Sequence, residues 1–510
     1  MAPNILFLMC DQMAARALPL YGGSGPKIPH LSALAARGTL FENAYCSFPL
    51  CAPSRFAMMA GRLPSRIGAY DNGAEFPSSI PTFVHYLRLL GYETTISGKL
   101  HYVGADQLHG FEERLTTDIY PADLGWTARW QALGEHSLVP AKAEGEGVGS
   151  CDIVNDAGPY ARSMQMDYDE EVFAQGLQKI YDIARGPRER PFFLKVSFTQ
   201  PHDPYIARRE DWDLYAESEI PAPAVPAPAE DAHSQELMAH YSIDRFPISP
   251  ENTLKARRAY FAMISDMDRK IGRLLEALAE TGLARDTAVV FTSDHGDMMG
   301  EHGLWFKKTF YDWAMRVPLI IAPAGGQASR RVARKVSHLD LLPTLVELAG
   351  GRAENIVSGP DGASLLPDVL GEGGEGDRVL AEHLDEGTRA PRFMIRQGDY
   401  KYVASPTYPP LLFDLARDPE EEENLAASPA MAEVVEDFER TLAATWDPAA
   451  LTEAILDNQR RRALVHAALT RGRWTDWDYA PPYRAGERLV RHRDDFPEVE
   501  RRGYLPYAGS

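Results

Sequence analysis

Ionisable side chains follow four of the short apolar segments of this sequence, and together they could bind a metal ion and an anion. They are Asp11 with Gln12, Lys99 with His101, His202, and Asp294 with His295. If the apolar segments are strands of one parallel sheet, these groups meet at one edge, because ligands bind beyond the carboxyl ends of such strands. A single histidine or aspartate there usually caps a turn. Two carboxylates, three imidazoles and a lysine together indicate an active site.

Asp11 and the pair Asp294–His295 are suited to a divalent cation. Oxygen ligands with one imidazole fit a hard or borderline ion better than a thiolate zinc site does. Asp294 by itself could instead cap a helix that leads into a turn at Gly296. The presence of Asp11 at the end of a different strand favours the metal.

The segment from Cys51 to Arg55 (CAPSR), followed by Gly61 and Arg62, indicates a helix that begins near Cys51. Pro53 suits the first helical turn, and Gly61 suits the helix end. A cysteine at a helix N-terminus lies beside free N–H groups, which favour an anion. The residue pattern leaves three interpretations open: a buried structural cysteine, a nucleophile of low pKa, or part of an anion site.

The elements that must position these residues alternate between strand and helix, which predicts an α/β fold with a parallel sheet covered on both faces. The predicted strands span residues 5–9, 92–97, 192–198, 288–292 and 317–321. The predicted helices span residues 31–37, 79–90, 169–184, 252–280 and 339–348. A stretch rich in Pro and Ala, residues 221–231, is expected to be a surface excursion.

The chain divides into three predicted regions. Residues 1–375 form the catalytic domain, which ends at the glycine-rich segment 371–376. Residues 376–440 contain short apolar runs at hairpin spacing, which predict a small antiparallel subdomain. Residues 441–510 are expected to form a helix and an extended tail.

Composition restricts the partners of the chain. The 510 residues carry a formal net charge of −20, which argues against nucleic acid and against an anionic membrane surface. Four cysteines do not make a disulfide framework, and no apolar run reaches the ~18 residues of a membrane span. We therefore predict a cytoplasmic protein.

The motif Cys51-x-Pro53-Ser54-Arg55, with Gly61-Arg62 behind it, resembles the signature of the type I sulfatases, members of the alkaline phosphatase superfamily. The strand ends described above, including the loop from Pro201 to Pro204, occur in the order that this family has. The resemblance implies a large, mostly parallel sheet flanked by helices, with a small C-terminal antiparallel sheet. It also implies that a separate formylglycine-generating enzyme oxidises Cys51 to formylglycine, whose hydrate attacks the sulfur of a sulfate monoester.

The same resemblance implies a role for each matching residue. One divalent ion, with Ca²⁺ the first choice and Mg²⁺ or Mn²⁺ the alternatives, would be held by Asp11, Cys51, Asp294 and His295. Arg55 would hold the formylglycine and the carboxylates, and Lys99 would neutralise a sulfate oxygen. His101 would take the proton of the second hydroxyl, and His202 and Lys307 would bind sulfate and assist the leaving oxygen. Lys307 is preferred over Lys308 because its offset of thirteen from Asp294 matches the family, and Lys308 is expected on a solvated face.

The substrate follows less directly from the sequence. Gln12 and His295, in place of the Asp and Asn of many arylsulfatases, occur in choline sulfatases and in phosphonate monoester hydrolases. The phosphonate enzymes generally carry Tyr and Thr where this chain has Lys99 and His101, so a sulfate monoester is favoured and a phosphonate or phosphodiester is the alternative. A non-catalytic sulfate-binding protein, whose cysteine is never converted, is the second alternative.

The segments around Asn72, from Val103 to Trp126, and from Trp474 resemble choline sulfatases most. Asn72 and Gln12 would contact substrate, and Trp126 could face a quaternary ammonium with Asp385 or Glu386 as counter-charge. Trp126 could equally be core or interface packing, and the stretch 128–165 lacks the aromatic pattern of a choline pocket, so an aryl sulfate or another small alkyl sulfate stays open.

The C-terminal tail contains four aromatic residues within ten positions: Trp474, Trp477, Tyr479 and Tyr483. Such a segment is too apolar for a solvated tail and favours docking on another surface. In similar choline sulfatases the tail crosses a subunit interface. We therefore predict a homodimer or a homotetramer.

Overall fold

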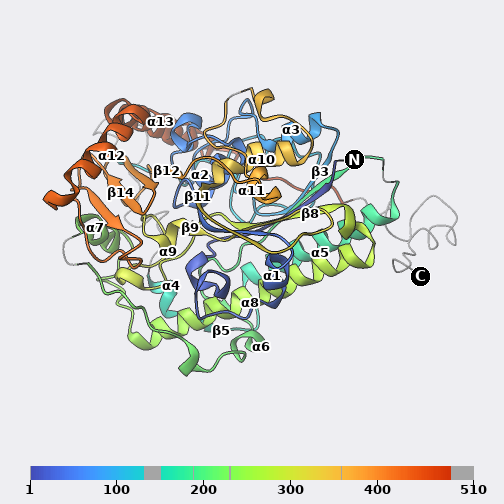
Figure 1. The fold of residues 1–510 in the computed structure, drawn as a ribbon, viewed down its shortest axis with the longest axis horizontal. Helices are drawn as coiled ribbons and strands as arrows, with labels where there is room; N and C mark the ends of the chain where they lie inside the picture. Colours follow the sequence, from blue (N-terminus) through green and yellow to red (C-terminus); the bar gives the residue numbers. More distant parts are fainter. Residues whose placement is uncertain (1, 131–150, 188, 229–230, 358, 484–510) are drawn as a thin grey trace.

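The computed structural model describes residues 2–130, 151–187, 189–228, 231–357 and 359–483, and its core is a nine-stranded sheet between two layers of helices (Figure 1). The strands are β1 (Asn4–Cys10), β2 (Thr39–Tyr45), β3 (Glu93–Gly98), β4 (Glu113–Arg114), β6 (Phe192–Ser197), β8 (Thr287–Ser293), β9 (Arg316–Val317), β10 (Leu319–Ala322) and β11 (Arg330–Ser337). Their order is β11-β2-β10-β8-β1-β6-β3-β4, with β9 beside β2. Only the pairings of β9 and β10 are antiparallel, which confirms the mostly parallel sheet.

Alternate residues of β1 enter two different cores, because successive side chains of a strand point to opposite faces. Leu6 and Leu8 pack in the core with helices α1 (Pro29–Ala35), α5 (Met164–Arg185) and α8 (Pro250–Glu280). Ile5, Phe7 and Met9 pack in the core with α2 (Cys51–Ala60), α3 (Phe83–Leu89) and α10 (Leu341–Leu348). Figure 1 shows these two helix layers above and below the sheet.

The carboxyl ends of four central strands lie in register. Cys10 at the end of β1 pairs with Ser293 of β8, and Ser197 of β6 pairs with both Met9 and Gly98 of β3. The residues that follow these strands therefore begin at one edge of the sheet. This confirms the arrangement predicted from the apolar segments.

Strands β2, β4 and β11 are not predicted from the sequence, and the predicted strand 317–321 is observed in a different form. The short strand β4 has only two residues, and β2 and β11 contain charged or polar residues among the apolar ones. β11 is an edge strand, where charged side chains protect the open edge. The predicted strand 317–321 is interrupted at Pro318, which has no N–H to donate, and forms the separate strands β9 and β10.

The described part of the predicted surface excursion, residues 221–228, is irregular but not wholly superficial. Val225 is buried there and donates its N–H to Glu301 at 3.0 Å. Part of this proline-rich stretch thus packs against the loop that follows β8.

A second sheet of four antiparallel strands follows the large sheet and confirms the predicted C-terminal sheet. It consists of β12 (Arg378–His383), β13 (Arg392–Gln397), β14 (Tyr400–Ala404) and β15 (Leu411–Asp414), with β12 the unpredicted member. Helices α12 (Ala432–Thr445) and α13 (Pro448–Leu469) follow it, at the left of Figure 1. Phe393 of β13 stacks on Trp446 between the two helices, with ring centroids 4.6 Å apart.

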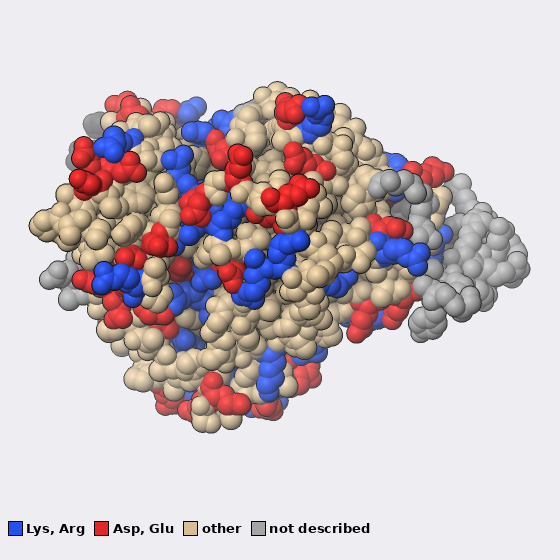
Figure 2. All heavy atoms as spheres, viewed as in Figure 1, with Lys and Arg blue, Asp and Glu red and all other residues tan. Residues whose placement is uncertain are grey.

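Shorter α-helices and strands, with short 3₁₀ helices between elements, make up the rest of the described secondary structure. They are α4 (Asp152–Asn155), β5 (Gly158–Pro159), β7 (Ile206–Ala207), α6 (Arg209–Trp212), α7 (Ala232–His240), α9 (Asp312–Met315) and α11 (Leu366–Leu370). Across the described ranges, no helix combines the length and the apolar character that a membrane crossing requires. Basic and acidic side chains are interspersed on the face of the molecule that Figure 2 shows.

Candidate active site

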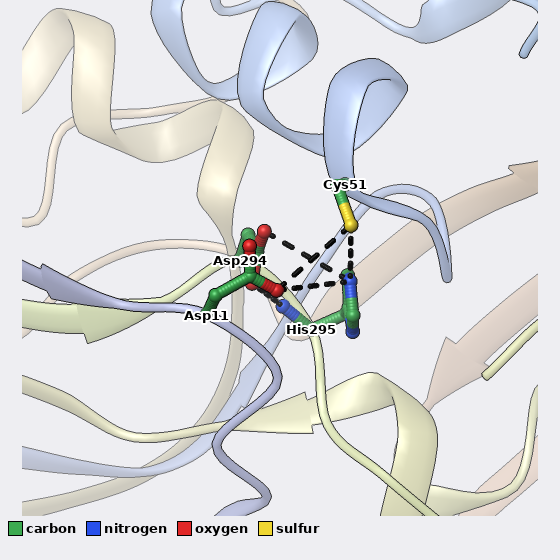
Figure 3. Close-up of side chains that lie close together, drawn as sticks. All are labelled: Asp11, Cys51, Asp294 and His295. Atoms are coloured by element: carbon green, nitrogen blue, oxygen red, sulfur yellow. Dashed lines mark hydrogen bonds and ion pairs between the residues drawn. The ribbon is translucent and has the colours of Figure 1, made fainter. Parts of the chain in front are cut away.

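Four buried side chains converge where β1 and β8 end and α2 begins (Figure 3). Asp11, Cys51, Asp294 and His295 each direct one ligand atom inward, and these atoms all lie within 4.8 Å of one another. The Sγ atom of Cys51 is 3.3 Å from Nε2 of His295 and 3.8 Å from Oδ1 of Asp11. The structure thus brings together all four predicted metal ligands.

The chemistry of this cluster fits a divalent cation. Nδ1 of His295 donates to the carbonyl oxygen of Gly296 at 2.9 Å, since a carbonyl can only accept. With Nδ1 as the donor, the lone pair of an Nε2 that carries no proton points toward Asp11 and Asp294, whose carboxylate oxygens are 3.8 and 3.9 Å away. Acceptors facing one another in a buried space repel unless a cation lies between them.

Arg55 on α2 connects the two carboxylates. Its guanidinium donates to Asp294 at 2.8 Å and to Asp11 at 3.1 Å, and it also donates to the backbone carbonyl of Lys99 at 2.9 Å. Burial opposes ionisation of Asp11, but the charges of Lys99 and Arg55 outweigh it and hold the pKa of Asp11 below its usual range. Arg55 therefore orients both carboxylates and favours the ionised form of Asp11.

Lys307 lies on the other side of Cys51. Its Nζ is 2.7 Å from Nε2 of His202 and 3.4 Å from Sγ of Cys51, and it donates to Oε1 of Gln12 at 2.5 Å. The amide nitrogen of Gln12 donates to Asp203 at 3.0 Å and to Asp297 at 2.6 Å. Gln12, predicted to contact substrate, is thus fully buried with both ends of its amide bonded to protein groups.

Lys99 and His101 reach the site from the end of β3. Lys99 contacts the carboxylate of Asp11, and its Nζ is 4.2 Å from the ring centre of Tyr120. The backbone N–H of His101 donates to Asp118 at 2.8 Å, where φ of His101 is +59°. Burial lowers the pKa of the His101 imidazole, which favours its neutral form.

Sequence reasoning missed two carboxylates that hold these loops. Asp118 accepts from the N–H groups of Leu100 and His101 and from Arg114, at 2.8 to 3.0 Å. Asp169 on α5 accepts from the N–H groups of Thr199 and Gln200, at 2.7 and 2.8 Å, immediately before the loop with His202. Neither position belongs to a motif, so the sequence offers no signal for them.

A cavity of about 290 Å³ opens onto this cluster. Its lining residues are Leu50, Cys51, Asn72, Tyr120, Trp126, His202, Asp203, Tyr241, Phe306, Lys307 and Lys308. We call Cys51, His202 and Lys307 of this lining, together with Lys99 and His101, which adjoin the lining residues Tyr120 and Trp126, the charged floor. We call the part formed by Asn72, Tyr120, Trp126 and Lys308 the loop wall.

The loop wall is anchored by a buried ion pair. Arg462 of α13 donates to both oxygens of Asp71, at 2.6 and 2.7 Å, and to the hydroxyl of Thr127 at 3.2 Å. These contacts fix the neighbours of Asn72 and Trp126. Oδ1 of Asn72 accepts from the N–H of Ala52 at 3.0 Å, at the beginning of α2.

Trp126 lines the cavity and is partly buried. The sequence leaves open whether this side chain faces the substrate or packs in the core. Its ring is 5.5 Å from that of His101 and 4.9 Å from that of Tyr120. The wall therefore presents an aromatic surface beside the imidazole of the floor.

The expectation that Lys308 is solvated is wrong. Its side chain is buried in the loop wall, with Nζ 3.0 Å from Oδ2 of Asp385 and 4.0 Å from Oε2 of Glu386. The backbone at Lys308 is left-handed, with φ of +71°, and its ammonium is paired with Asp385, whereas that of Lys307 contacts Cys51 and His202. Asp385 and Glu386, the candidate counter-charges, thus lie beside a lysine.

The described part of the tail contacts the segment from Arg114 to Ala122 of the same chain. Asp478 accepts from the N–H of Ala122 at 2.8 Å, and Arg114 lies over the ring of Tyr479 at 5.4 Å. The side chains of Trp474 and Tyr483 are 52% and 81% exposed. The rest of the predicted tail, from residue 484, and part of the segment 128–165 lie outside the described residues.

Comparisons with known proteins give one family for most of the chain. The profile of the family described as Sulfatase matches residues 3–351. Profiles described as Choline sulfatase enzyme C terminal and as N-sulphoglucosamine sulphohydrolase, C-terminal, match residues 453–503 and 300–447.

Individual relatives can be aligned with most or nearly all of this chain. The Choline-sulfatase of Rhizobium meliloti (strain 1021) is 44% identical over 513 residues, covering 98% of this chain and 97% of that protein. The Arylsulfatase of Clostridium perfringens (strain 13 / Type A) is 28% identical, covering 87% and 94%. Among solved structures, the phosphonate monoester hydrolase of Agrobacterium radiobacter is similar with a TM-score of 0.68 and 26% identity, covering 87% of this chain and 95% of that chain.

Proposed function

This chain belongs to the sulfatase family and hydrolyses sulfate monoesters, and from that premise we propose that choline sulfate is its substrate. The observation that carries the proposal is the cavity, which joins a floor suited to a sulfuryl group to a wall with an aromatic ring and two carboxylates nearby. The 44% identity to a choline-sulfatase over nearly the whole chain supports it.

In this proposal Cys51 is converted to formylglycine by a separate formylglycine-generating enzyme, and its hydrate provides the hydroxyl that attacks sulfur. Asp11, Asp294, His295 and residue 51 would hold a divalent ion, with Ca²⁺ preferred and Mg²⁺ or Mn²⁺ as alternatives. Such an ion would polarise a sulfuryl oxygen and would lower the pKa of the attacking hydroxyl. Arg55 orients the two carboxylates.

The residues of the charged floor divide the remaining work. Lys99 contacts Asp11 and Lys307 contacts Cys51, each from a different loop. Because both ammonium groups lie beside the proposed nucleophile and metal ligands, both would neutralise sulfuryl oxygens. His101, neutral because burial lowers its pKa, would accept the proton of the second hydroxyl when sulfate leaves.

His202 is suited to the leaving oxygen. Burial alone would lower the pKa of its imidazole, but the neighbouring carboxylate of Asp203 raises it above the ordinary value. Nε2 of His202 lies 2.7 Å from Nζ of Lys307, so either group of this pair would deliver the proton that the departing alcohol takes up.

The alcohol portion of the substrate would lie against the loop wall. A quaternary ammonium over the ring of Trp126 gains about 0.5–2 kcal/mol from a cation–π contact. Asn72 uses its carbonyl oxygen to cap α2, which leaves its amide nitrogen for the substrate. Asp385 and Glu386 supply negative charge near Lys308.

The setting of the reaction is part of the proposal. The exposed aromatic residues Trp474 and Tyr483 favour a homodimer or homotetramer in which the tail docks on a second copy of the chain. The four buried, unpaired cysteines agree with a reducing cytoplasm.

Hydrolysis of choline sulfate tests the proposal directly. We expect kcat/KM for choline sulfate to exceed that for a phosphonate monoester, and Asp294→Ala to lose bound metal and activity together. Asp377→Ala, which removes a carboxylate paired with Lys335 away from the cavity, is the matched control and should keep both. A tenfold preference for the phosphonate, about 1.4 kcal/mol in the barrier, would overturn the assignment.

A further inference from the structure

The loop wall contains a lysine that the proposed sulfuryl chemistry does not use. Lys308 lines the cavity together with Asn72 and Trp126, yet its Nζ lies 3.0 Å from Asp385 and 4.0 Å from Glu386. The same Nζ is 3.4 Å from Nε2 of His240 on α7. Lys308 is therefore the partner of the carboxylates that a cationic substrate would need.

The backbone keeps Lys307 and Lys308 directed to different partners. Phe306 and Lys308, on either side of Lys307, both have left-handed backbones, with φ of +62° and +71°. A left-handed backbone is unfavourable for a residue with a side chain, so surrounding contacts must hold this turn. The N–H of Lys308 donates to the carbonyl of Pro49 at 3.1 Å, which holds this turn against the segment before Cys51.

Lys308 also determines the charge of the wall. Burial raises the pKa of Asp385 to about 7, and the ammonium of Lys308 acts against that rise. With both carboxylates ionised, as at pH 8.5, one lysine and two carboxylates carry one net negative charge at the part of the wall that Lys308 forms. A quaternary ammonium that enters the wall must share these carboxylates with an ammonium already paired to them.

We propose that Lys308 is a specificity-determining residue that limits how strongly this active site favours cationic over neutral sulfate esters. The proposal rests on the proposed function and deepens it. By neutralising one carboxylate, Lys308 weakens the attraction for a quaternary ammonium, and the cavity then also accepts esters of uncharged alcohols and phenols.

A set of three variants tests this role. The readout is the ratio of kcat/KM for choline sulfate to kcat/KM for p-nitrophenyl sulfate, measured at pH 8.5 on the full chain loaded with metal. Lys308→Met removes the cation and should raise the ratio about tenfold. Asp385→Asn removes a carboxylate and should lower the ratio by a similar factor. The double variant Lys308→Met/Asp385→Asn restores one net negative charge and should return the ratio to within about twofold of the parent.

The comparison of Asp385→Asn with the double variant keeps the test decisive if Lys308→Met alone does not fold. Asp385 is absent from both of these proteins, so neither contains it as an ionised group without a partner. The ratio for the double variant should be about tenfold higher than that for Asp385→Asn, because the double variant also lacks the lysine. Lys335→Met, which removes a lysine from an ion pair with Asp377 away from the cavity, should leave the ratio unchanged.

The two proposals fail in different ways. A parent enzyme that hydrolyses neither ester contradicts the proposed function. A parent that hydrolyses both, with a ratio that does not change when Lys308 is removed in either background, contradicts the role of Lys308.

Discussion

The charged floor and the loop wall belong to one cavity but are built differently. Lys99 and Asp294 in and beneath the floor directly follow β3 and β8, whose last residues lie in register with those of β6 and β1. The wall is formed by loops, and its anchor Asp71 pairs with Arg462, 391 residues further along the chain. A sheet fixes its edge closely, whereas loops vary at little cost to the fold. Floor residues should thus serve every sulfate ester, and wall residues should discriminate between esters.

The largest effect is expected in the floor. Lys307→Met removes an ammonium that contacts Cys51 and His202, and loss of one such contact to a developing anion costs ~10²–10³ in rate. We expect kcat/KM for choline sulfate and for p-nitrophenyl sulfate both to fall by roughly this factor, and more for choline sulfate, whose alkoxide is the poorer leaving group and depends more on the assistance of Lys307. A loss confined to one of the two esters would contradict the division between floor and wall.

The wall anchor should show its effect in stability. Arg462→Met leaves the carboxylate of Asp71 buried without its partner, which costs about 3 kcal/mol in the free energy of unfolding. Urea denaturation measures this loss, and the double variant Arg462→Met/Asp71→Asn should recover part of it because no unpaired charge remains. Equal stability of the parent and Arg462→Met would show that the ion pair does not anchor the wall.

The same contrast explains which parts of the site the sequence predicts. Asp11, Lys99, His202 and Asp294 follow apolar strand segments, so the general rule that ligands bind at the carboxyl ends of parallel strands is enough to place them together. The burial of Lys308 comes with a left-handed backbone and a pairing partner, Asp385, far along the chain, and the residue types around Lys308 indicate neither.

The anchors of the loops escape prediction for a related reason. Asp118, Asp169 and the pair Asp71–Arg462 act through contacts between loops or helices that follow no periodic pattern. The strands β2 and β11 escape it because tertiary pairing, not apolar character, places them in the sheet.

Asp169, which holds the loop before His202, should make the free energy of unfolding depend on pH. Burial raises the pKa of Asp169 to about 7, above its value of roughly 4 in an unfolded chain. The folded state then holds a proton that the unfolded state has lost, so this residue makes stability fall as pH rises from 5 to 7, by about 2 kcal/mol. Asp169→Asn should remove that slope, whereas Asp167→Asn, at an exposed position of the same helix, should keep it. Identical slopes in all three proteins would contradict the expected titration.

The smallest effect is expected for the aromatic surface of the wall. Trp126→Ala should reduce kcat/KM for choline sulfate by the equivalent of about 0.5–2 kcal/mol more than for p-nitrophenyl sulfate. Trp126→Phe should keep part of the difference, because a phenyl ring still presents a π face. Equal losses on both esters for Trp126→Ala would contradict binding of the quaternary ammonium by the wall and would indicate a sulfatase without preference for choline sulfate.

The state of residue 51 tests the central claim most directly, because the proposed chemistry of the floor depends on it. The mass of the peptide that spans Cys51 should be measured in protein purified from its native host and active on choline sulfate. We predict an aldehyde in place of the thiol, and loss of turnover in Cys51→Ala. An unmodified thiol in fully active protein, with choline sulfate turned over at the same rate by Cys51→Ala, would contradict the account.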